Sequence, residues 1–470
     1  MSVETARGVL GDATIGELEA AVRGSVVRPG DAAYEEARAV WNAAHDKRPA
    51  LVVRCAGVAD VIRAVEFARS QDLLVAVRGG AHSIAGFSTC DGGIVIDLSG
   101  MKGVRVDPGR RRVIAEAGLT WGELDHETQA FGLAVTGGLV SSTGVSGFTL
   151  GGGVGWLLRR HGLACDNLVG ADLVTADGRL VHADAEEHPE LFWALRGGGG
   201  NFGVVTSLEF ELHPVGPQVL AGLVIYPAAE AAQVVRRWRD LCPDLPDELT
   251  TLVNLTTAPP LPFLPEAVHG TRIVVLAAMY AGPAEAGEEA VRPLRSLGTP
   301  IADVLGPMPY LGMQTLLDPL WTRGAHNYFT SAFVEPSDAA LDAVTAAHLT
   351  TPTPQSEIHL HQLGGAFARV PAGATAFSQR DAGVLCNVIA RSPEADGFDG
   401  HADWARATRE AIARHGNGSM YVNFTGDGER DKALASYPQE VRDRLVRVKD
   451  AYDPTNLFRL NQNIRPSAAG

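Results

Sequence analysis

Short apolar runs alternate with helical patterns along the first part of the chain. Residues 50–55 and 73–77 are largely apolar runs bounded by polar or glycine residues, which is the pattern of buried strands. The segment between them has apolar side chains with the i, i+3, i+4, i+7 spacing of an amphipathic helix: Val58, Val61, Ile62 and Val65. This order of strand, helix and strand predicts a βαβ-like unit.

The same patterns continue to about residue 212. Apolar or alternating runs predict further strands at residues 93–98, 112–118, 171–175 and 204–212. Thr120 and Glu123 have the spacing of a capping box, so we expect a helix that opens there and runs to about Ala130.

From residue 217 to about 415, strand and helix patterns are mixed. Strands are predicted at residues 219–226, 271–279, 327–334, 357–363 and 383–389. Helices are predicted at residues 228–241, 284–292, 339–347 and 401–413. This mixture predicts an α+β domain built on an antiparallel sheet.

The length of the chain and a proline-containing segment at residues 213–217 indicate how the chain divides. A chain of 470 residues is too long for one ordinary hydrophobic core, so we expect two domains. We place the first at residues 1–216 and the second at 217–415, and we treat residues 416–470 as a separate C-terminal segment.

The 73–77 strand ends in a glycine-rich loop, Arg78-Gly79-Gly80-Ala81-His82-Ser83, with Gly86 shortly after it. Paired glycines permit positive φ angles and let backbone N–H groups approach a ligand such as a phosphate. His82 lies among small residues, which is a poor position for a core side chain. From these residues alone it is either a ligand-binding group or an ordinary hydrogen-bonded loop histidine.

A dense block of glycines occupies residues 136–155. This many glycines disfavour a helix, but they suit a loop packed on a flat ligand, because backbone approaches closely where Cβ is absent. A run of tight turns is the alternative.

Residues 198–203 match the pattern G-x-G-x-x-G. A Rossmann site for a nicotinamide cofactor needs a strand before this pattern and a helix after it. Here residues 189–195 have a helical pattern and residues 204–212 a strand pattern, so the order is reversed. We therefore reject the Rossmann interpretation.

Charge and cysteine content exclude several classes of protein. The net charge of −15 argues against nucleic acids and anionic membranes as partners. Five scattered cysteines without C-x-x-C pairs indicate neither a disulfide framework nor a metal site. The N-terminus lacks the apolar stretch of a signal peptide, and no apolar run approaches the about 18 residues of a membrane span. We expect a cytoplasmic protein without a metal.

The loop R-G-G-x-H-S-x-x-G resembles the flavin-attachment loop of the berberine-bridge-enzyme-like oxidases, within the vanillyl-alcohol-oxidase superfamily. The segments around residues 162–167, 196–206 and 461–463 also match the family pattern. The resemblance implies a two-domain α+β fold of the PCMH type, in which residues 1–216 bind FAD and residues 217–415 bind substrate. It further implies that residues 416–470 return to the flavin domain.

The resemblance also implies a cofactor site with FAD attached covalently, through its 8α carbon, to His82. The other residues expected to bind the cofactor come from the glycine loops and the C-terminal segment: Arg78, Gly79, Gly80, Ala81, Ser83, Gly86, Gly137, Thr143, Gly144, Gly147, Gly152, Gly155, Val205, Asn461 and Asn463.

The chain departs from the family pattern at the positions of a second flavin link and of two usual bases. Family members with two links have a cysteine where this chain has Val140-Ser141, and Cys165 lies beyond that loop, so no cysteinyl link is expected. Phe424 replaces a common tyrosine, and Thr330 replaces a lysine of some bacterial relatives.

With the usual bases absent or moved, other polar residues become the candidates for the catalytic site: His361, Asn387 and Tyr421. On the 357–363 strand, His359, His361 and Leu363 alternate onto one face. By the family pattern we expect His361 to face the substrate and to act as the base or to orient the substrate. Each candidate is otherwise an ordinary buried hydrogen-bonded residue.

The resulting expectation is an FAD-dependent oxidase that takes hydride from a small organic alcohol, phenol or sugar and passes electrons to O₂, giving H₂O₂. A dehydrogenase of the same fold with another electron acceptor is one alternative. A flavin-containing protein that binds a ligand without turnover is another. The sequence leaves the oligomeric state open.

Overall fold

The N-terminal part of the chain forms a four-stranded sheet with a parallel centre. The computed structural model describes residues 3–5 and 8–469. β4 (Leu51–Arg54) and β5 (Val75–Arg78) both pair in parallel with β6 (Ile94–Asp97), and α3 (Val58–Ser70) connects β4 to β5. β3 (Ser25–Val27) is the antiparallel edge strand. The predicted βαβ-like unit is confirmed, and it delivers the loop that follows β5.

A second, five-stranded antiparallel sheet has the order β11-β10-β12-β8-β7. Its strands are β7 (Val104–Asp107), β8 (Arg112–Glu116), β10 (Leu168–Val174), β11 (Leu180–Asp184) and β12 (Val204–Glu211). The helices of this region are α4 (Trp121–Gln129), α5 (Val145–Leu150), α6 (Leu158–His161) and α7 (Pro189–Leu195). The predicted start of α4 is confirmed, since the Thr120 N–H donates to Glu123 at 2.8 Å.

The expectation that the glycine block disfavours a helix is wrong at one place. α5 lies inside the block because the glycines sit mainly at its ends. Gly144 precedes its first residue, Gly151 follows its last, and Gly147 alone lies within it. A short helix therefore survives between two glycine loops.

The largest sheet is eight-stranded and antiparallel, with the main order β17-β14-β16-β15-β20-β21-β19 and with β18 paired to β14. Its strands are β14 (Gln218–Pro227), β15 (Leu249–Thr257), β16 (Arg272–Tyr280), β17 (Ala302–Asp303), β18 (Gly306–Pro309), β19 (His326–Val334), β20 (Glu357–Gln362) and β21 (Val384–Ser392). The sequence analysis did not predict β15, which pairs β16 with β20 at the centre of the sheet.

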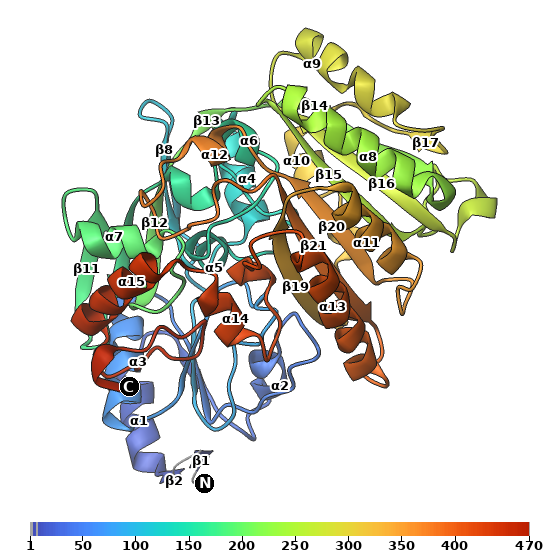
Figure 1. The fold of residues 1–470 in the computed structure, drawn as a ribbon. Helices are drawn as coiled ribbons and strands as arrows, with labels where there is room; N and C mark the ends of the chain where they lie inside the picture. Colours follow the sequence, from blue (N-terminus) through green and yellow to red (C-terminus); the bar gives the residue numbers. More distant parts are fainter. Residues whose placement is uncertain (1–2, 6–7, 470) are drawn as a thin grey trace.

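Helices cover one face of this sheet. They are α8 (Ala231–Leu241), α11 (Asp338–His348) and α13 (Phe398–Ala413), and Figure 1 shows them side by side along the strands. Their apolar side chains and those of the sheet form one buried cluster that includes Trp238, Leu341 and Ile412. The opposite face is turned toward the flavin-binding part expected from the sequence. The antiparallel sheet predicted for residues 217–415 is thus confirmed.

The C-terminal segment returns to the first part of the molecule, as predicted. α14 (Arg430–Ala435) and α15 (Gln439–Tyr452) follow α13, and α15 packs against α7. Lys449 is fully buried and donates to the Asp453 carboxylate at 2.7 Å and to the Asn201 and Phe458 carbonyls. This network fixes the segment against the 198–203 loop. The bounds 1–216, 217–415 and 416–470 stay predictions.

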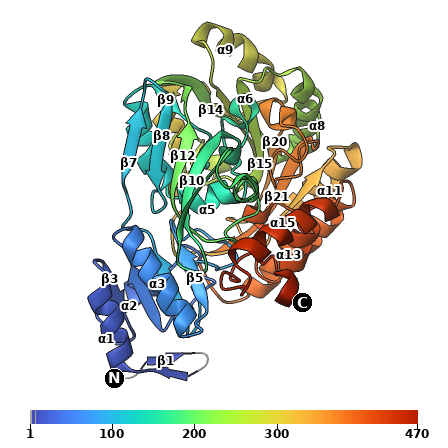
Figure 2. The same cartoon turned by 90° about the vertical axis from the view of Figure 1, so that its left-hand side faces the viewer.

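The remaining elements lie at the periphery or connect the sheets: β1 (Val3–Thr5), β2 (Gly8–Leu10), α1 (Asp12–Ala21), α2 (Tyr34–Arg38), β9 (Leu133–Ala134), β13 (His213–Pro214), α9 (Ala284–Val291), α10 (Tyr310–Gln314) and α12 (Ala366–Arg369). Figures 1 and 2 place α1 and α3 at one end of the molecule and α9 at the other. Among the described residues, none of the helices is long and apolar enough to cross a membrane.

Candidate active site

One cavity of about 350 Å³ lies where the three parts of the chain meet. Its walls come from the loop after β5, the glycine loops around α5 and before β12, strands β19 to β21, and the C-terminal segment. Residues more than 300 positions apart in sequence therefore face the same space.

Most of the residues expected to bind a ligand line this cavity. They are Gly79, Gly80, Ala81, His82, Ser83, Thr143, Gly144, Gly147, Val205, Asn461, His361 and Asn387. The others lie outside its lining: Arg78, Gly86, Gly137, Gly152, Gly155, Asn463 and Tyr421.

The residues outside the lining have structural contacts. Arg78 is buried and forms an ion pair with Asp97 at 2.7 Å at the end of the parallel strands. A Cβ on Gly155 would lie 1.8 Å from the Gly137 carbonyl oxygen, so these two loop segments are in backbone contact. These residues support the segments that line the cavity. Their positions outside the lining do not support direct contact with a ligand.

The loop after β5 turns sharply to present His82. Ala81 has a φ of +60°, a left-handed conformation that is uncommon for a residue with a side chain. The His82 ring stacks on Trp41 with 4.8 Å between ring centroids, and its Nε2 lies 3.0 Å from Ser142 Oγ. Burial and, to a smaller extent, Arg323 lower the pKa of His82 to about 4. The imidazole is therefore neutral near pH 7 and keeps a lone pair for bonding.

The lining fits a flavin dinucleotide. In the described part of the chain, the backbone N–H groups of residues 79–84 donate no hydrogen bond, so they are free for an anionic or carbonyl-bearing ligand. The buried oxygens Asn461 Oδ1 and Gln462 Oε1 likewise have no partner among the described residues. Because buried polar groups are normally hydrogen-bonded, these atoms indicate a ligand with complementary polar edges.

The sheet supplies the opposite end of the cavity. β20 places His359 and His361 on its wall, as the strand alternation predicted, and β21 places Asn387 directly opposite His359. Leu363, the third residue of that alternation, lies beyond the end of β20 in a separate apolar cluster. Burial and His359 hold the pKa of His361 well below its ordinary value, so His361 is neutral.

Two features of this end were missed from the sequence. Glu357, at the start of β20, lies with its Oε1 2.8 Å from His359 Nε2. Trp41 and Trp321 form part of the wall and stack with 6.3 Å between ring centroids. Glu357 has the same two-residue alternation as the histidines, and that signal could have identified it.

Two segments of the chain match known family models, and nearly the whole chain matches known proteins. Residues 49–184 match the family model described as an FAD binding domain, and residues 420–465 match the model described as berberine and berberine like. An FAD-linked oxidoreductase of Dictyostelium discoideum is 32% identical over 458 residues, which cover 96% of this chain and 97% of that protein. The chain belongs to the berberine-bridge-enzyme-like family of FAD-linked oxidoreductases.

Other members of this family agree in fold over nearly the full chain. The (R)-6-hydroxynicotine oxidase of Paenarthrobacter nicotinovorans is 31% identical, covering 95% of this chain and 98% of that protein. A crystal structure of 6-hydroxy-D-nicotine oxidase from Arthrobacter nicotinovorans matches with a TM-score of 0.85 at 29% identity, covering 95% of this chain and 98% of that one. This protein is thus an FAD-dependent enzyme with the predicted PCMH-type fold.

A xylooligosaccharide oxidase from Myceliophthora thermophila, solved in complex with xylobiose, also matches, with a TM-score of 0.82 at 25% identity over 97% of this chain and 99% of that one. Family members with very different substrates therefore share this fold. The substrate has to be inferred from the side chains of the cavity.

Tyr421 does not take the position of a base in this family member. Its hydroxyl accepts hydrogen bonds from the Gly153 N–H at 2.8 Å and from Asn423 Nδ2 at 2.9 Å, and it lies outside the main cavity. Burial raises the pKa of Tyr421. Thr330 is buried in β19 and also lies outside the lining, whereas Phe424 is part of the wall.

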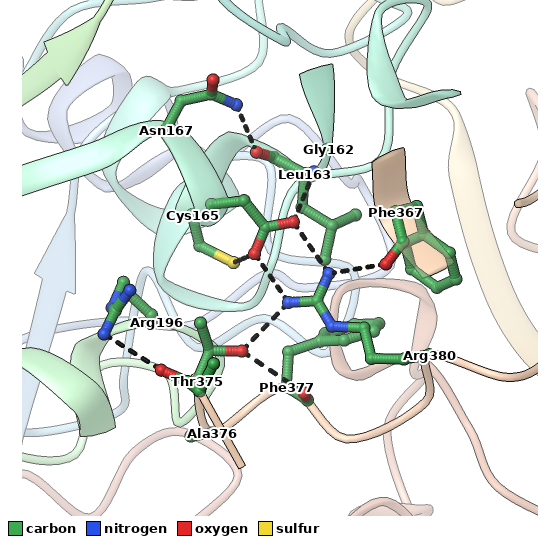
Figure 3. Close-up of polar contacts among 12 residues, drawn as sticks. Gly162, Leu163, Cys165, Asn167, Arg196, Phe367, Thr375, Ala376, Phe377 and Arg380 are labelled. Carbon is green, nitrogen blue, oxygen red and sulfur yellow. Dashed lines mark hydrogen bonds and ion pairs between the residues drawn. The ribbon is translucent and has the colours of Figure 1, made fainter. Parts of the chain in front are cut away.

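Cys165 is buried away from the cavity, in the cluster of polar contacts that Figure 3 shows around Arg380. Its Sγ lies 3.8 Å from Asp166 Oδ1, and Arg380 binds both oxygens of Asp166 at 2.6 and 2.7 Å. Burial raises the pKa of Cys165 well above the ordinary range. The Asp166–Arg380 pair fastens the loop between β20 and β21 to the first part of the chain.

Proposed function

We propose that this enzyme is an oxidase that carries FAD on His82 alone, oxidises a small hydroxylated aromatic compound and passes the electrons to O₂ to form H₂O₂. Within the FAD-linked oxidase chemistry of the family, this enzyme would thus have a single covalent flavin link, one class of substrate and O₂ as its electron acceptor.

The single link is supported by the position of two side chains. His82 is neutral, lies on the cavity wall and has a nitrogen available for a bond. Val140 lines the cavity where family members with two links have a cysteine, and Cys165 is buried elsewhere. Trp41 and Ser142 would hold the His82 ring in one orientation.

The substrate class is supported by the wall at the sheet end of the cavity. Four aromatic rings line it: Trp41, Trp321, Phe329 and Phe424. The described strands β19 to β21 contribute three polar side chains to this wall, His359, His361 and Asn387, with Asn387 Oδ1 and His361 Nε2 unpartnered among the described residues. An oligosaccharide needs many hydrogen bonds, whereas a flat ring with one or two polar groups matches this wall.

Each residue then has a defined task. FAD, when bound, accepts a hydride from the substrate and returns electrons to an acceptor. The aromatic rings hold the substrate ring and exclude water. His361 and Asn387 hydrogen-bond its polar group, which fixes the C–H bond that reacts. His361 is therefore proposed to orient the substrate, the second of the two roles considered for it from the sequence.

The test is a screen for peroxide release under air. Hydroxypyridines, including 6-hydroxynicotine, and hydroxybenzyl alcohols form one set, and xylobiose and cellobiose form the other. We expect peroxide from members of the aromatic set alone. Turnover of the sugars would contradict the substrate class.

Anaerobic mixing separates the alternatives. Flavin that is bleached by an aromatic substrate and recovers on addition of air supports the oxidase. Bleached flavin that recovers with an artificial acceptor but not with air indicates a dehydrogenase. If aromatic compounds shift the flavin spectrum, which shows that they bind, but never bleach the flavin, the protein binds its ligand without turnover.

A further inference from the structure

We propose that Glu357 and His359 form a proton-accepting pair at the sheet end of the cavity, with His359 as the base and Glu357 as the residue that positions it. This inference rests on the proposed function, because it assigns the acceptor of the proton that an O–H or N–H substrate must lose.

The geometry of the pair is that of a buried carboxylate holding an imidazole. The two residues are two positions apart on β20 and so lie on the same face. Glu357 Oε1 lies 2.8 Å from His359 Nε2, and both side chains are buried, with the two residues 8% and 6% exposed. Asn254 on β15 donates to the other carboxylate oxygen at 2.8 Å. Glu357 is thus held from two strands.

The carboxylate stays ionised in this environment. Burial alone raises the pKa of Glu357, but the charge of a protonated His359 and the hydrogen bonds from His359 and Asn254 lower it by more, and the net shift is downward. Arg391 on β21 adds a favourable charge, and its guanidinium lies 4.7 Å from the centroid of the Trp321 ring. A negative charge beside His359 stabilises the imidazolium that forms when it takes a proton.

The remaining groups around His359 are uncharged. His361 follows it on the same face of β20, with 5.7 Å between ring centroids, and Asn387 opposes it on β21. Trp321 meets its ring edge-on at 6.2 Å. Glu357 therefore supplies the negative charge in direct contact with His359, and Arg391 acts at longer range through Glu357.

His359 has the free nitrogen that a base needs. Its Nε2 is engaged by Glu357 and so carries the proton in the neutral ring, which leaves the lone pair on Nδ1. Within the described chain, no hydrogen bond uses that Nδ1, and the residue lines the cavity. His361 lacks a carboxylate partner, and its lowered pKa makes it a weak base.

In the proposed step, the substrate carries its O–H or N–H on the carbon that is oxidised, as in a benzyl alcohol. That O–H or N–H bond breaks, and its proton forms an N–H bond on Nδ1 of His359. The electron pair left on oxygen or nitrogen forms the new double bond to carbon as the adjacent C–H bond breaks. FAD, when bound in its oxidised form, would accept the hydride from that bond. Glu357 remains a carboxylate throughout and stabilises the imidazolium.

The first test needs no substrate. Nuclear magnetic resonance of the holoenzyme labelled in its histidine rings reports the tautomer and titration of His359, whose signal is assigned by its loss in His359→Gln. We expect the Nε2–H tautomer in the neutral ring. In Glu357→Gln the titration midpoint should fall by about one pH unit or more, the effect of losing a nearby opposite charge. The other tautomer, or an unchanged midpoint, would overturn the pair.

The second test measures anaerobic flavin reduction by the fastest-reacting compound of the aromatic screen that carries its O–H on the carbon to be oxidised, as the hydroxybenzyl alcohols do. His359→Gln should slow the limiting rate by about 10²–10⁴-fold, the range for a lost general base. Glu357→Gln should slow it less and shift its pH profile, and Glu357→Asp should restore part of the rate.

The matched control is His361→Gln on the same face of the same strand. It should weaken substrate binding more than it slows the limiting rate. The pair is wrong if His359→Gln reduces flavin at the wild-type rate, or if His361→Gln alone shows the large loss. FAD content and unfolding temperature are measured for each variant so that misfolding is recognised. Failure of every compound to reduce wild-type flavin would contradict the proposed function, while the ring titration would still decide the pair.

Discussion

At the scale of single residues, the cofactor loop depends on two positions where side chains are absent. A Cβ on Gly80 would lie 2.4 Å from the backbone nitrogen of Gly144, and a Cβ on Gly144 would lie 2.4 Å from that of Gly80. The two glycine loops are therefore in direct backbone contact beside His82. Both positions require glycine because the space between the two backbones is too small for a Cβ atom.

Gly80→Ala should separate the two loops. Since backbone cannot yield as a flexible side chain does, we expect a loss of about 1–3 kcal/mol in unfolding free energy and a lower FAD content. Gly16→Ala is the control, because no atom lies within 4 Å of its added Cβ and the residue lies in α1, outside the cavity lining. Absorbance of purified protein and its thermal unfolding measure both effects. Equal values for Gly80→Ala and the wild type would contradict the contact.

Residues that line the cavity could be predicted from the sequence where one continuous loop carries them, as it carries His82 and its neighbours. Trp41 and Trp321 could not, since they meet from positions 280 residues apart only after folding. Tyr421 was considered for catalysis from its position in the C-terminal segment, but its hydroxyl is turned to the Gly153 N–H instead.

At the scale of elements, α4 and α10 meet through a buried carboxylate. Asp125 is 1% exposed and accepts one hydrogen bond, from Gln314 Nε2 at 2.8 Å. In the described structure its other oxygen has no partner, nor has the Tyr310 hydroxyl close by in α10. Burial raises the pKa of Asp125 to about 7.

This raised pKa makes the contact sensitive to pH. Between about pH 4 and pH 7 the folded protein keeps a proton on Asp125 that the unfolded chain, with an ordinary carboxyl pKa of about 4, has lost. The contribution of Asp125 to stability is therefore complete below about pH 4 and declines as the pH rises to about 7.

Asp125→Asn should remove that decline, because an amide of the same shape does not titrate. We expect the variant to exceed the wild type in unfolding free energy at pH 8 by on the order of 2–4 kcal/mol, and by much less at pH 5. Denaturant unfolding at the two pH values measures this. Glu127→Gln, an exposed change on the same helix, should follow the wild type. If the unfolding free energy of Asp125→Asn falls between pH 5 and pH 8 as much as that of the wild type, Asp125 is not the source of this pH dependence.

Elements were predictable where hydrophobic periodicity is strong, as in β4, α3 and β5. β15 was not predicted although Leu249–Thr257 is rich in β-branched residues. Its threonines interrupt the run of apolar side chains by which the other strands were predicted. α5 was not predicted because the number of glycines in the block disfavours a helix, although only Gly147 lies within α5. Both errors arise where tertiary packing stabilises a segment with weak local preference.

At the scale of the whole molecule, the cavity forms because three distant segments converge. The parallel sheet presents His82, the large antiparallel sheet presents β20 and β21, and the C-terminal segment closes the remaining side through Asn461. Lys449 and Asp453, both fully buried, fix that last segment. The resemblance of the loop motifs to a known family was enough to predict this architecture, whereas the composition of the wall depends on the folded contacts.

The central claim is that one FAD is bound to His82 and to no other residue. Mass spectrometry of the denatured protein and of its proteolytic peptides tests it most directly. We predict an intact mass increased by one FAD, a flavin on the peptide that contains His82 alone, and extractable FAD in His82→Ala. An unmodified mass with all FAD released on denaturation, or a flavin on the peptide that contains Cys165, would contradict it.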